Sequence, residues 1–377
     1  AGTSAGMDPS SFFRYLSTLP RSERQIKVDS FRAVHTTFPL TGIDSTCSFF
    51  YFGEADSVSI AGDFTGWAPT FPLAHSEGTN LWFASRKFER DARIDYKFVI
   101  NRDHWIKDPS NPDSCAGGAG TNSELKMPDY IVPPEILYHP EIPHGSMVDA
   151  EFPTGNIKPR ILTIYLPPYY ERNSREYAVI VFNDGTDYIK YGAIQNVLDY
   201  LIAGQQIEPV IGVFIPPVER EEEYAGRLKE DYSKFILETV MPVIEAKYNI
   251  SRDPRKRIIA GSSNGGNISV YIALDHPGSF GRVIAQSSNV EKDILPLVQN
   301  PDVSGILFYL DIGSYDLPVL IPRVINFIDI LQGNHLGFTY RQWHDGHSWG
   351  NWKAHIRYPL VEFLNPEESG NENNNSK

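Results

Sequence analysis

The residues best suited to chemistry in this sequence are a serine and the glycines around it. The stretch Gly261–Gly265 reads Gly-Ser-Ser-Asn-Gly, and it lies between a short apolar run and a stretch with helical periodicity. A serine at such a strand-to-helix turn is held in a strained backbone conformation, and its hydroxyl stands clear of the sheet. The flanking glycines are needed because side chains there would collide across the turn. The pattern predicts that Ser263 is a nucleophile, the alternative being a Gly/Ser turn that merely links two elements.

A serine of this kind needs a base that is oriented by a third group. In enzymes with such a turn, the acid and then the base follow the serine, each after a later strand of the same sheet. The acid is expected after the apolar run 306–310. Asp316 is preferred because it lies beyond a Gly-Ser turn, where it is free to reach a histidine. Asp311, at the end of the run, is the alternative and is expected to tie down the loop.

The base is expected after the last strand, over residues 338–342. His344 and His347 both follow it. Gly346 allows a tight turn just before His347, so we predict that His347 is the base and that His344 is a core or rim histidine. The sequence therefore predicts a Ser263–His347–Asp316 triad.

Two backbone N–H groups are needed to stabilise the oxyanion that forms when a serine attacks a carbonyl. One is predicted to be that of Asn264, directly after the serine. The other is expected in the loop Asn183–Asp187, where Gly185 allows close backbone approach; its alternative role is that of an ordinary turn glycine.

Further side chains are expected near this site. Arg220, Glu223 and Tyr224 follow the apolar run 210–215, and they either line the pocket or form a local ion pair. The residues predicted to contact substrate are Asp184, Arg220, Glu223, Tyr224, Trp349 and Trp67.

The elements that must position these residues fall into two parts. From about residue 31 to 128, short alternating runs recur every ten or so residues, a spacing typical of a small antiparallel sandwich. From 129 to 366, apolar strands alternate with helical patterns, which predicts an α/β domain with a doubly wound, mostly parallel sheet. Residues 1–30 are expected to form a helical strap after a short leader of small residues, with Asp8 as a helix N-cap. Residues 367–377 are expected to be a disordered tail.

Composition narrows the function classes. The chain has 377 residues, 41% of them hydrophobic, and a net charge of −13, which disfavours nucleic acid and anionic membranes as partners. No membrane span or secretory segment is visible, which predicts a cytoplasmic protein or a secreted one whose signal peptide has been removed. The two cysteines, Cys47 and Cys115, form one disulfide or remain buried thiols. No Cys/His set has metal-ligand spacing.

Several motifs together resemble a known family. Residues 164–168 (Ile-Tyr-Leu-Pro-Pro), Asp184-Gly185, Arg220 with Glu223-Tyr224, the serine turn, residues 280–287 and Gly346-His347 are similar to the esterase D / enterochelin esterase family of α/β-hydrolases. Ser262 departs from the His or Gln that usually precedes the serine in that family. Residues 58–67 (Val-Ser-Ile-Ala-Gly-Asp-Phe-Thr-Gly-Trp) resemble the early-set immunoglobulin-like module that precedes some of these esterases. In the carbohydrate-binding members of that module, exposed tryptophans stack on sugars. The alternative is that Trp67 caps the small core or packs against the next domain.

The resemblance implies a serine carboxylesterase without a metal or organic cofactor. Its substrate is a small-molecule ester, of the siderophore trilactone type, or a feruloyl or acetyl ester linked to a polysaccharide. The alternative functions are an acyltransferase of the same fold and a non-catalytic glycan-binding protein. For the oligomeric state, a homodimer is left open.

Overall fold

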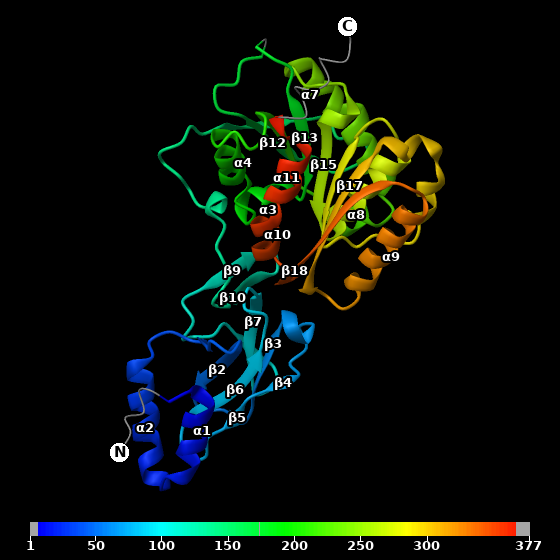
Figure 1. The fold of residues 1–377 in the computed structure, drawn as a ribbon. Helices are drawn as coiled ribbons and strands as arrows, with labels where there is room; N and C mark the ends of the chain where they lie inside the picture. Colours follow the sequence, from blue (N-terminus) through cyan, green and yellow to red (C-terminus); the bar gives the residue numbers. More distant parts are fainter. Residues whose placement is uncertain (1–6, 173, 367–377) are drawn as a thin grey trace. The chain divides into compact units, whose positions relative to one another are not determined.

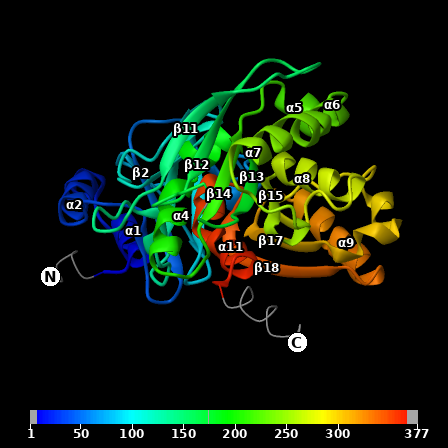
Figure 2. The ribbon, with the colours of Figure 1, turned by 90° about the horizontal axis from the view of Figure 1, so that it is seen from above.

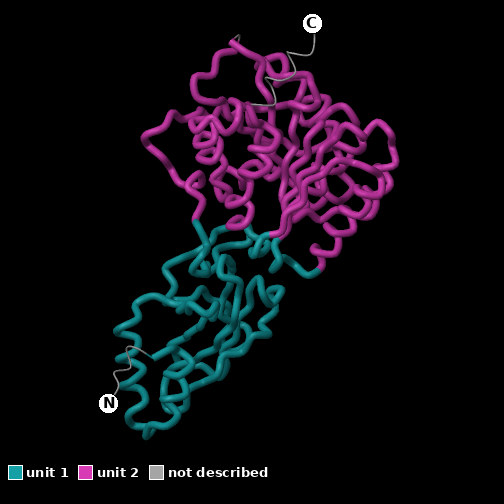
Figure 3. Tube along the Cα trace, in the orientation of Figure 1, with its two compact units in different colours: residues 1–131, 313–318, 343–348 teal, residues 132–312, 319–342, 349–377 magenta. Residues whose placement is uncertain are grey.

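The computed structural model describes residues 7–172 and 174–366, which form two compact units. The expected leader at 1–5 and tail at 367–377 lie outside the described residues. Unit 1 contains the chain up to Ile131 together with two short later segments, Gly313–Pro318 and Trp343–Ser348, and unit 2 contains the rest (Figure 3). The boundary thus passes through strands β17 and β18, which begin in unit 2 and end in unit 1.

Unit 1 has two antiparallel sheets, with strand orders β1-β2-β6-β5 and β4-β3-β7-β10-β9, and β8 pairs with β7. Its elements are α1 (Pro9–Thr18), α2 (Arg21–Val34), β1 (Leu40–Thr41), β2 (Thr46–Phe52), β3 (Val58–Gly62), β4 (Phe71–Pro72), β5 (Ala74–His75), β6 (Leu81–Lys87), β7 (Arg93–Ile100), β8 (His104–Ile106), β9 (Ser114–Gly117) and β10 (Gly120–Lys126).

The two sheets share one core, because their strands alternate inward and outward side chains. Phe49 from β2 and Trp82 from β6 pack in the same cluster as Ile60 from β3 and Phe98 from β7. The alternating runs of the sequence predict strands over 47–52, 57–61, 81–85 and 95–100, and each agrees with β2, β3, β6 or β7 to within two residues at either end. Cys47 and Cys115 are both buried thiols and are not joined in a disulfide, so the disulfide alternative is wrong.

Two helices cover the outer face of the first sheet. In α1, Asp8 caps the first turn as predicted, accepting a hydrogen bond from the Ser11 N–H at 3.0 Å. The helical strap was expected over residues 1–30, and α2 continues it to Val34, where alternating strands were expected from about residue 31. Its buried residues are Val28 and Phe31 in an otherwise strongly polar stretch, so its apolar periodicity is weak.

Unit 2 is built on an eight-stranded sheet of order β11-β12-β14-β13-β15-β16-β17-β18. The five consecutive strands β14, β13, β15, β16 and β17 pair in parallel. This confirms the doubly wound α/β prediction. The elements, seen in Figure 1, are β11 (Ser146–Glu151), β12 (Ile161–Leu166), β13 (Ala178–Asn183), α3 (Gly185–Lys190), α4 (Ile194–Ala203), β14 (Val210–Ile215), α5 (Arg220–Tyr224), α6 (Lys229–Lys234), α7 (Met241–Lys247), β15 (Arg257–Ser262), α8 (Asn264–Asp275), β16 (Arg282–Gln286), β17 (Leu307–Tyr315), α9 (Leu320–Gly333), β18 (Gly337–Gly346), α10 (Trp349–His355) and α11 (Arg357–Phe363).

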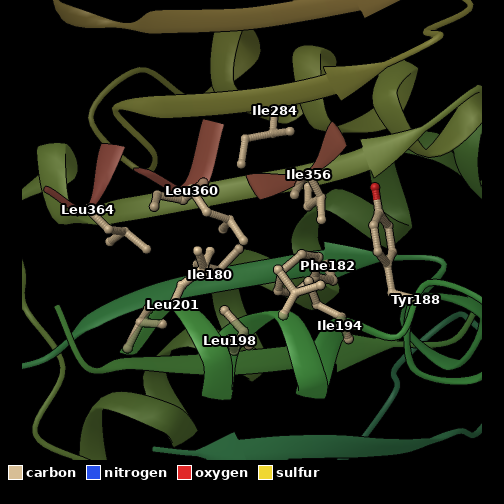
Figure 4. Close-up of a cluster of buried hydrophobic side chains, with 14 of the residues drawn as sticks. Ile180, Phe182, Tyr188, Ile194, Leu198, Leu201, Ile284, Ile356, Leu360 and Leu364 are labelled. Carbon is tan, nitrogen blue, oxygen red and sulfur yellow. The ribbon is translucent and has the colours of Figure 1, made fainter. Parts of the chain in front are cut away.

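Helices cover both faces of this sheet, and α4 and α8 lie on opposite sides of β13 and β15 (Figure 2). On one face, Ile180 and Phe182 of β13 pack against Leu198 of α4 and Leu360 of α11 (Figure 4). Alternate side chains of each strand face the other way, and Phe308 of β17 meets Phe327 of α9 with ring centroids 5.8 Å apart. The continuous apolar runs of these strands are explained by burial on both faces.

Candidate active site

The turn at Ser263 has the geometry of a nucleophile elbow. Strand β15 ends at Ser262, α8 begins at Asn264, and Ser263 between them has φ 53° and ψ −123°. A non-glycine residue with positive φ is strained by about 1–3 kcal/mol, so the surrounding structure must hold it. A Cβ on Gly261 would lie 2.1 Å from the carbonyl oxygen of Gly265, which confirms that the turn closes without room for a side chain.

Backbone hydrogen bonds fix the strained turn. The Ser263 N–H donates to the carbonyl of Gln286 at 2.9 Å, and the Asn289 N–H donates to the carbonyl of Ser263 at 3.3 Å. Asn264 is the first residue of α8, so its N–H belongs to the N-terminal turn, which has no acceptor within the helix. Its side chain donates to Glu221 at 2.7 Å. The backbone N–H predicted for an oxyanion hole is therefore at the open end of a helix.

Gly185, the other predicted oxyanion donor, begins α3 and is not in an open loop. A Cβ there would lie 2.3 Å from the backbone nitrogen of Ile215 and 2.4 Å from the carbonyl carbon of Phe214. Glycine is required at this position by the close approach of α3 to β14. This requirement is independent of any role in stabilising an oxyanion.

Asp184 and Arg220 form a bidentate ion pair next to the elbow. The Arg220 guanidinium donates two bonds of 2.7 Å to the Asp184 carboxylate. The backbone N–H of Asp184 donates to the Tyr224 hydroxyl at 2.8 Å. A Cβ on Gly265 would lie 2.7 Å from Asp184 Oδ2, so the carboxylate abuts the elbow itself. Burial raises the pKa of Asp184, although the Arg220 pair opposes this rise.

Glu223 has a different partner. Its carboxylate accepts bonds of 2.6 and 2.8 Å from Arg160, and the pair is almost completely removed from solvent. Arg220 and Glu223 therefore do not form the local ion pair that the sequence left open, because each binds a residue from another element. Both lie on helix α5, where the sequence had indicated a loop.

The two tryptophans predicted to contact substrate differ in environment. Trp349 is buried, and its ring meets those of Tyr188 and Trp352 edge-on at 4.9 and 5.0 Å. Trp67 is half-buried and donates from Nε1 to Asp63 Oδ1 at 3.1 Å. The contacts of Trp349 are those of a core residue.

Asp316 and His347 are brought together in unit 1. Strands β17 and β18 run longer than the sequence indicated, so Gly313 and Ser314 lie in a strand and not in a turn. His347 Nδ1 lies 2.8 Å from Asp316 Oδ1, and the Asp316 carboxylate is buried and also accepts the Leu317 N–H at 2.7 Å.

The alternative candidates have other surroundings. Asp311 lies inside β17, 3.5 Å from the side-chain amide of Gln286. His344 is largely exposed and lies 2.7 Å from Asp91. Of the two aspartates and two histidines considered, Asp316 and His347 form the pair. Ser263 belongs to unit 2, whereas this pair belongs to unit 1.

A buried charge cluster that the sequence analysis missed adjoins His347. Arg93, on β7, donates from Nη1 to Asp345 Oδ1 and to Ser348 Oγ, both at 3.0 Å, and its other nitrogens bind Asp95 and Glu124. The spacing of Arg93 and Asp95, two residues apart in an apolar strand, places both on one face and was the available signal.

Asp63 approaches the same segment. A Cβ on Gly346 would lie 2.0 Å from Asp63 Cγ, so Gly346 is required by this contact. Burial, together with the nearby carboxylates of Asp95 and Asp345, raises the pKa of Asp63 well above its usual range. Burial also raises the pKa of Asp345 to about 7, and the Arg93 guanidinium only partly offsets this.

A pocket of about 550 Å³ lies close to the elbow in unit 2. Asn289, which binds the Ser263 carbonyl, directly precedes its first lining residue. Three apolar residues and four charged ones line it together with Asn326: Val290, Leu295, Pro322, Glu291, Lys292, Asp293 and Arg323. Asp293 pairs with Lys229, and Arg323 donates to the side chain of Asn289. The pocket is therefore locally less acidic than the chain as a whole.

Two kinds of site are absent from the part of the chain that the structure describes. Within residues 7–172 and 174–366, no three His, Cys, Asp or Glu side chains are grouped as metal ligands. None of the helices in those ranges combines the length and apolar character that crossing a bilayer requires.

The family model for esterases matches residues 158–358, just over half of the chain. The chain belongs to the Esterase family. It is thus a hydrolase that acts on ester bonds, and its matched region contains the elbow, Asp316 and His347.

Relatives of this esterase include the iron(III) enterobactin esterase of Escherichia coli K12, which is 23% identical over 327 residues, spanning 77% of this chain and 80% of that one. Among solved structures, the ferric enterobactin esterase of Salmonella typhimurium has a TM-score of 0.76 at 18% identity, covering 89% of this chain and 98% of the other. The ferulic acid esterase of Anaeromyces mucronatus has a TM-score of 0.52 at 17% identity, covering 62% and 95%. These likenesses show an enterochelin esterase-like, α/β-hydrolase fold.

Proposed function

We propose that this esterase is a serine carboxylesterase in which Ser263 is the nucleophile. The observation that carries the proposal is the strained backbone of Ser263 at the junction of β15 and α8. Strain of this kind persists only where the surroundings enforce it, and it exposes the hydroxyl at the end of the sheet. Ser263, Asp316 and His347 also follow strands of one sheet in the order expected for a triad.

In the proposed mechanism, the Ser263 hydroxyl attacks the ester carbonyl carbon while His347 Nε2 accepts its proton. Asp316 accepts a hydrogen bond from the Nδ1–H of His347, which keeps the imidazole in the tautomer whose Nε2 lone pair acts as the base. The carbonyl oxygen becomes an oxyanion, for which the N–H groups of Asn264 and Gly185 are the proposed donors.

Collapse of this intermediate breaks the ester bond. The alcohol leaves with the proton from His347, and the acyl group stays on Ser263. Water then attacks the acyl-enzyme and gives a proton to His347, which passes it to Ser263 Oγ as the carboxylic acid is released.

For the substrate, we propose a siderophore trilactone as the first candidate. Support comes from coverage, because the enterobactin esterases resemble this chain across the N-terminal region as well, whereas the ferulic acid esterase covers only 62% of it. Lys292 and Arg323 in the pocket near the elbow suit an anionic catechol ester better than the net charge of −13 would suggest.

Feruloyl and acetyl esters of polysaccharides are the second candidate. The apolar side of the same pocket, formed by Val290, Leu295 and Pro322, suits an aromatic acyl group without charge. The likeness to a ferulic acid esterase favours this reading for the catalytic region alone.

The test compares hydrolysis of p-nitrophenyl acetate, enterobactin and methyl ferulate by wild type, Ser263→Ala and Ser262→Ala. Ser263→Ala is expected to lose at least about a thousandfold in kcat with an unchanged unfolding midpoint. Ser262→Ala, the neighbouring serine, is the matched control and should retain most activity.

Full activity in Ser263→Ala would contradict the mechanism. Faster turnover of methyl ferulate than of enterobactin would favour the second candidate. Ester products joined to an added sugar or alcohol would indicate acyl transfer. Retention on immobilised polysaccharide without turnover of any ester would favour a glycan-binding protein.

A further inference from the structure

Arg93 is a buried cation that is far in the sequence from the proposed catalytic residues. It nevertheless contacts one residue before and one residue after His347. The base segment, Trp343–Ser348, contains Asp345 and Ser348, and Arg93 Nη1 donates to each of them. The arginine side chain is 1% exposed. Its contacts are therefore directed and shielded from solvent, unlike those of a surface ion pair.

The geometry of the guanidinium explains why an arginine is suited to this position. Its planar fork presents several N–H donors in fixed directions, and here Nη2 binds Asp95 while Nε binds Glu124. Asp95 is on β7 and Glu124 on the neighbouring strand β10, so two strands of one sheet anchor the cation. Only the remaining nitrogen, Nη1, reaches the base segment.

The base segment is held at a second point by Asp63. Its carboxylate accepts the Asp95 N–H at 2.7 Å and the Trp67 indole N–H, and it lies against the α-carbon of Gly346. His347 is thus preceded by a residue packed on Asp63 and followed by a residue bonded to Arg93. Small backbone movements there would change the direction of the imidazole relative to Asp316.

We infer that Arg93 is a positioning residue, which fixes the base segment through Asp345 and Ser348 so that His347 meets Asp316 in the geometry needed for catalysis. Arg93 donates to the base segment and makes no proton transfer itself. This rests on the proposed role of His347 as the base, and it assigns to the N-terminal sheet a part in catalysis besides any binding of sugar.

The test uses the full chain and two readouts. The first is the downfield proton NMR signal of the His347 Nδ1–H bonded to Asp316, assigned by its loss in His347→Gln and Asp316→Asn. The second is kcat and KM for p-nitrophenyl acetate. Arg93→Met is expected to shift or broaden that signal and to lower kcat by about 10–100-fold, since a misplacement of about 1 Å has an effect of that size. KM should change less than about threefold, because a residue that only orients the base does not bind substrate.

The matched control is Arg90→Met. Arg90 lies three residues earlier in the same unit, and its guanidinium binds Asp129 and the carbonyl of Ile43. The Arg90→Met variant should leave the NMR signal and kcat unchanged. Arg93→Lys keeps the charge but loses the fork, and it is expected to recover only part of kcat.

A folded Arg93→Met with wild-type signal and wild-type kcat would overturn the inference, and so would a lost signal with unchanged kcat. If Arg93→Met does not fold, Asp345→Ala and Ser348→Ala carry the same test, because each removes one contact of Nη1. The signal reports the His347–Asp316 hydrogen bond and does not require Ser263. Failure of the inference is therefore distinct from failure of the proposed mechanism, which Ser263→Ala decides.

Discussion

The elbow around Ser263 and the base segment around His347 are held in place by different means. At the elbow, two glycines and backbone hydrogen bonds set the geometry, and the clash that requires Gly261 comes from a residue four positions away. The base segment is held by side chains, and Arg93 and Asp345 are 252 residues apart in sequence. A nucleophile can therefore be encoded in one short stretch, whereas the position of its base depends on distant strands.

The buried charges differ in the same way. In unit 2, Arg160 pairs with Glu223 and Arg220 with Asp184, so that each cation has one principal carboxylate. In unit 1, Arg93 alone serves Asp95, Glu124 and Asp345. Around the base segment, carboxylates outnumber the single arginine, so we expect their protonation to change with pH. In the unit 2 pairs, one positive charge faces one principal negative charge.

The largest effect is expected from the acid of the pair. Asp316→Asn should lower kcat by about ten-thousandfold, because an amide cannot stabilise the imidazolium and favours the wrong tautomer. Asp311→Asn is the matched variant, within the strand that Asp316 directly follows, and it should lower kcat less than tenfold. Steady-state kinetics on p-nitrophenyl acetate decides, and a greater loss in Asp311→Asn would transfer the acid role to that residue.

The next effect separates stability from catalysis in unit 2. Arg160→Met leaves the buried Glu223 carboxylate without its cation, which should lower the free energy of unfolding by about 3–5 kcal/mol. Urea unfolding measures this, and kcat/KM of the folded enzyme should stay within tenfold of wild type. A large rise in KM with unchanged stability would instead indicate that the Glu223 region contacts substrate.

A smaller effect is expected from filling the space beside Asp63. Gly346→Ala should lower the free energy of unfolding by about 1–3 kcal/mol, because the new methyl group displaces a carboxylate that two hydrogen bonds hold. Kinetics should show a lower kcat as well. Gly305→Ala, with no atom within 4 Å of the new Cβ, is the control. Adding Asp63→Ala to Gly346→Ala should restore part of the stability, and no recovery would argue against this contact.

The last effect concerns the pH dependence of stability. The pKa of Asp345 is raised to about 7, so the folded state holds this proton more tightly than the unfolded chain does. Stability from this group is present at low pH and declines as pH rises from about 4 to 7, by at most about 1.4 kcal/mol per pH unit. The free energy of unfolding, measured with urea at several pH values in this range, should fall less steeply with pH in Asp345→Asn than in wild type. Arg93, Asp95 and Asp63 surround the group, and an identical slope in the variant would assign the dependence to Asp63.

The sequence predicted the sheet of unit 2 and the Asp316–His347 pair, because strand periodicity and the order of the motifs are local signals. It did not predict that helix α2, whose buried positions are few, continues to Val34, or that β17 and β18 extend beyond their apolar runs. It also placed Gly185, Arg220 and Glu223 in loops, although each lies in a short helix. The Arg93 cluster could not be assigned, since its partners other than Asp95 lie on β10 and in the base segment, far from Arg93 in the sequence.

The passage of β17 and β18 from one unit into the other limits how the chain can be recombined. A chimera joined to a relative at residue 131 would combine Arg93 from one parent with Asp345 and Ser348 from the other. The free-energy effects of substitutions within one hydrogen-bonded network are not additive. Such a junction therefore replaces residues that fit one another with residues from two different parents. A functional exchange of the N-terminal region should therefore carry residues 313–318 and 343–348 with it, as parts of one inherited unit.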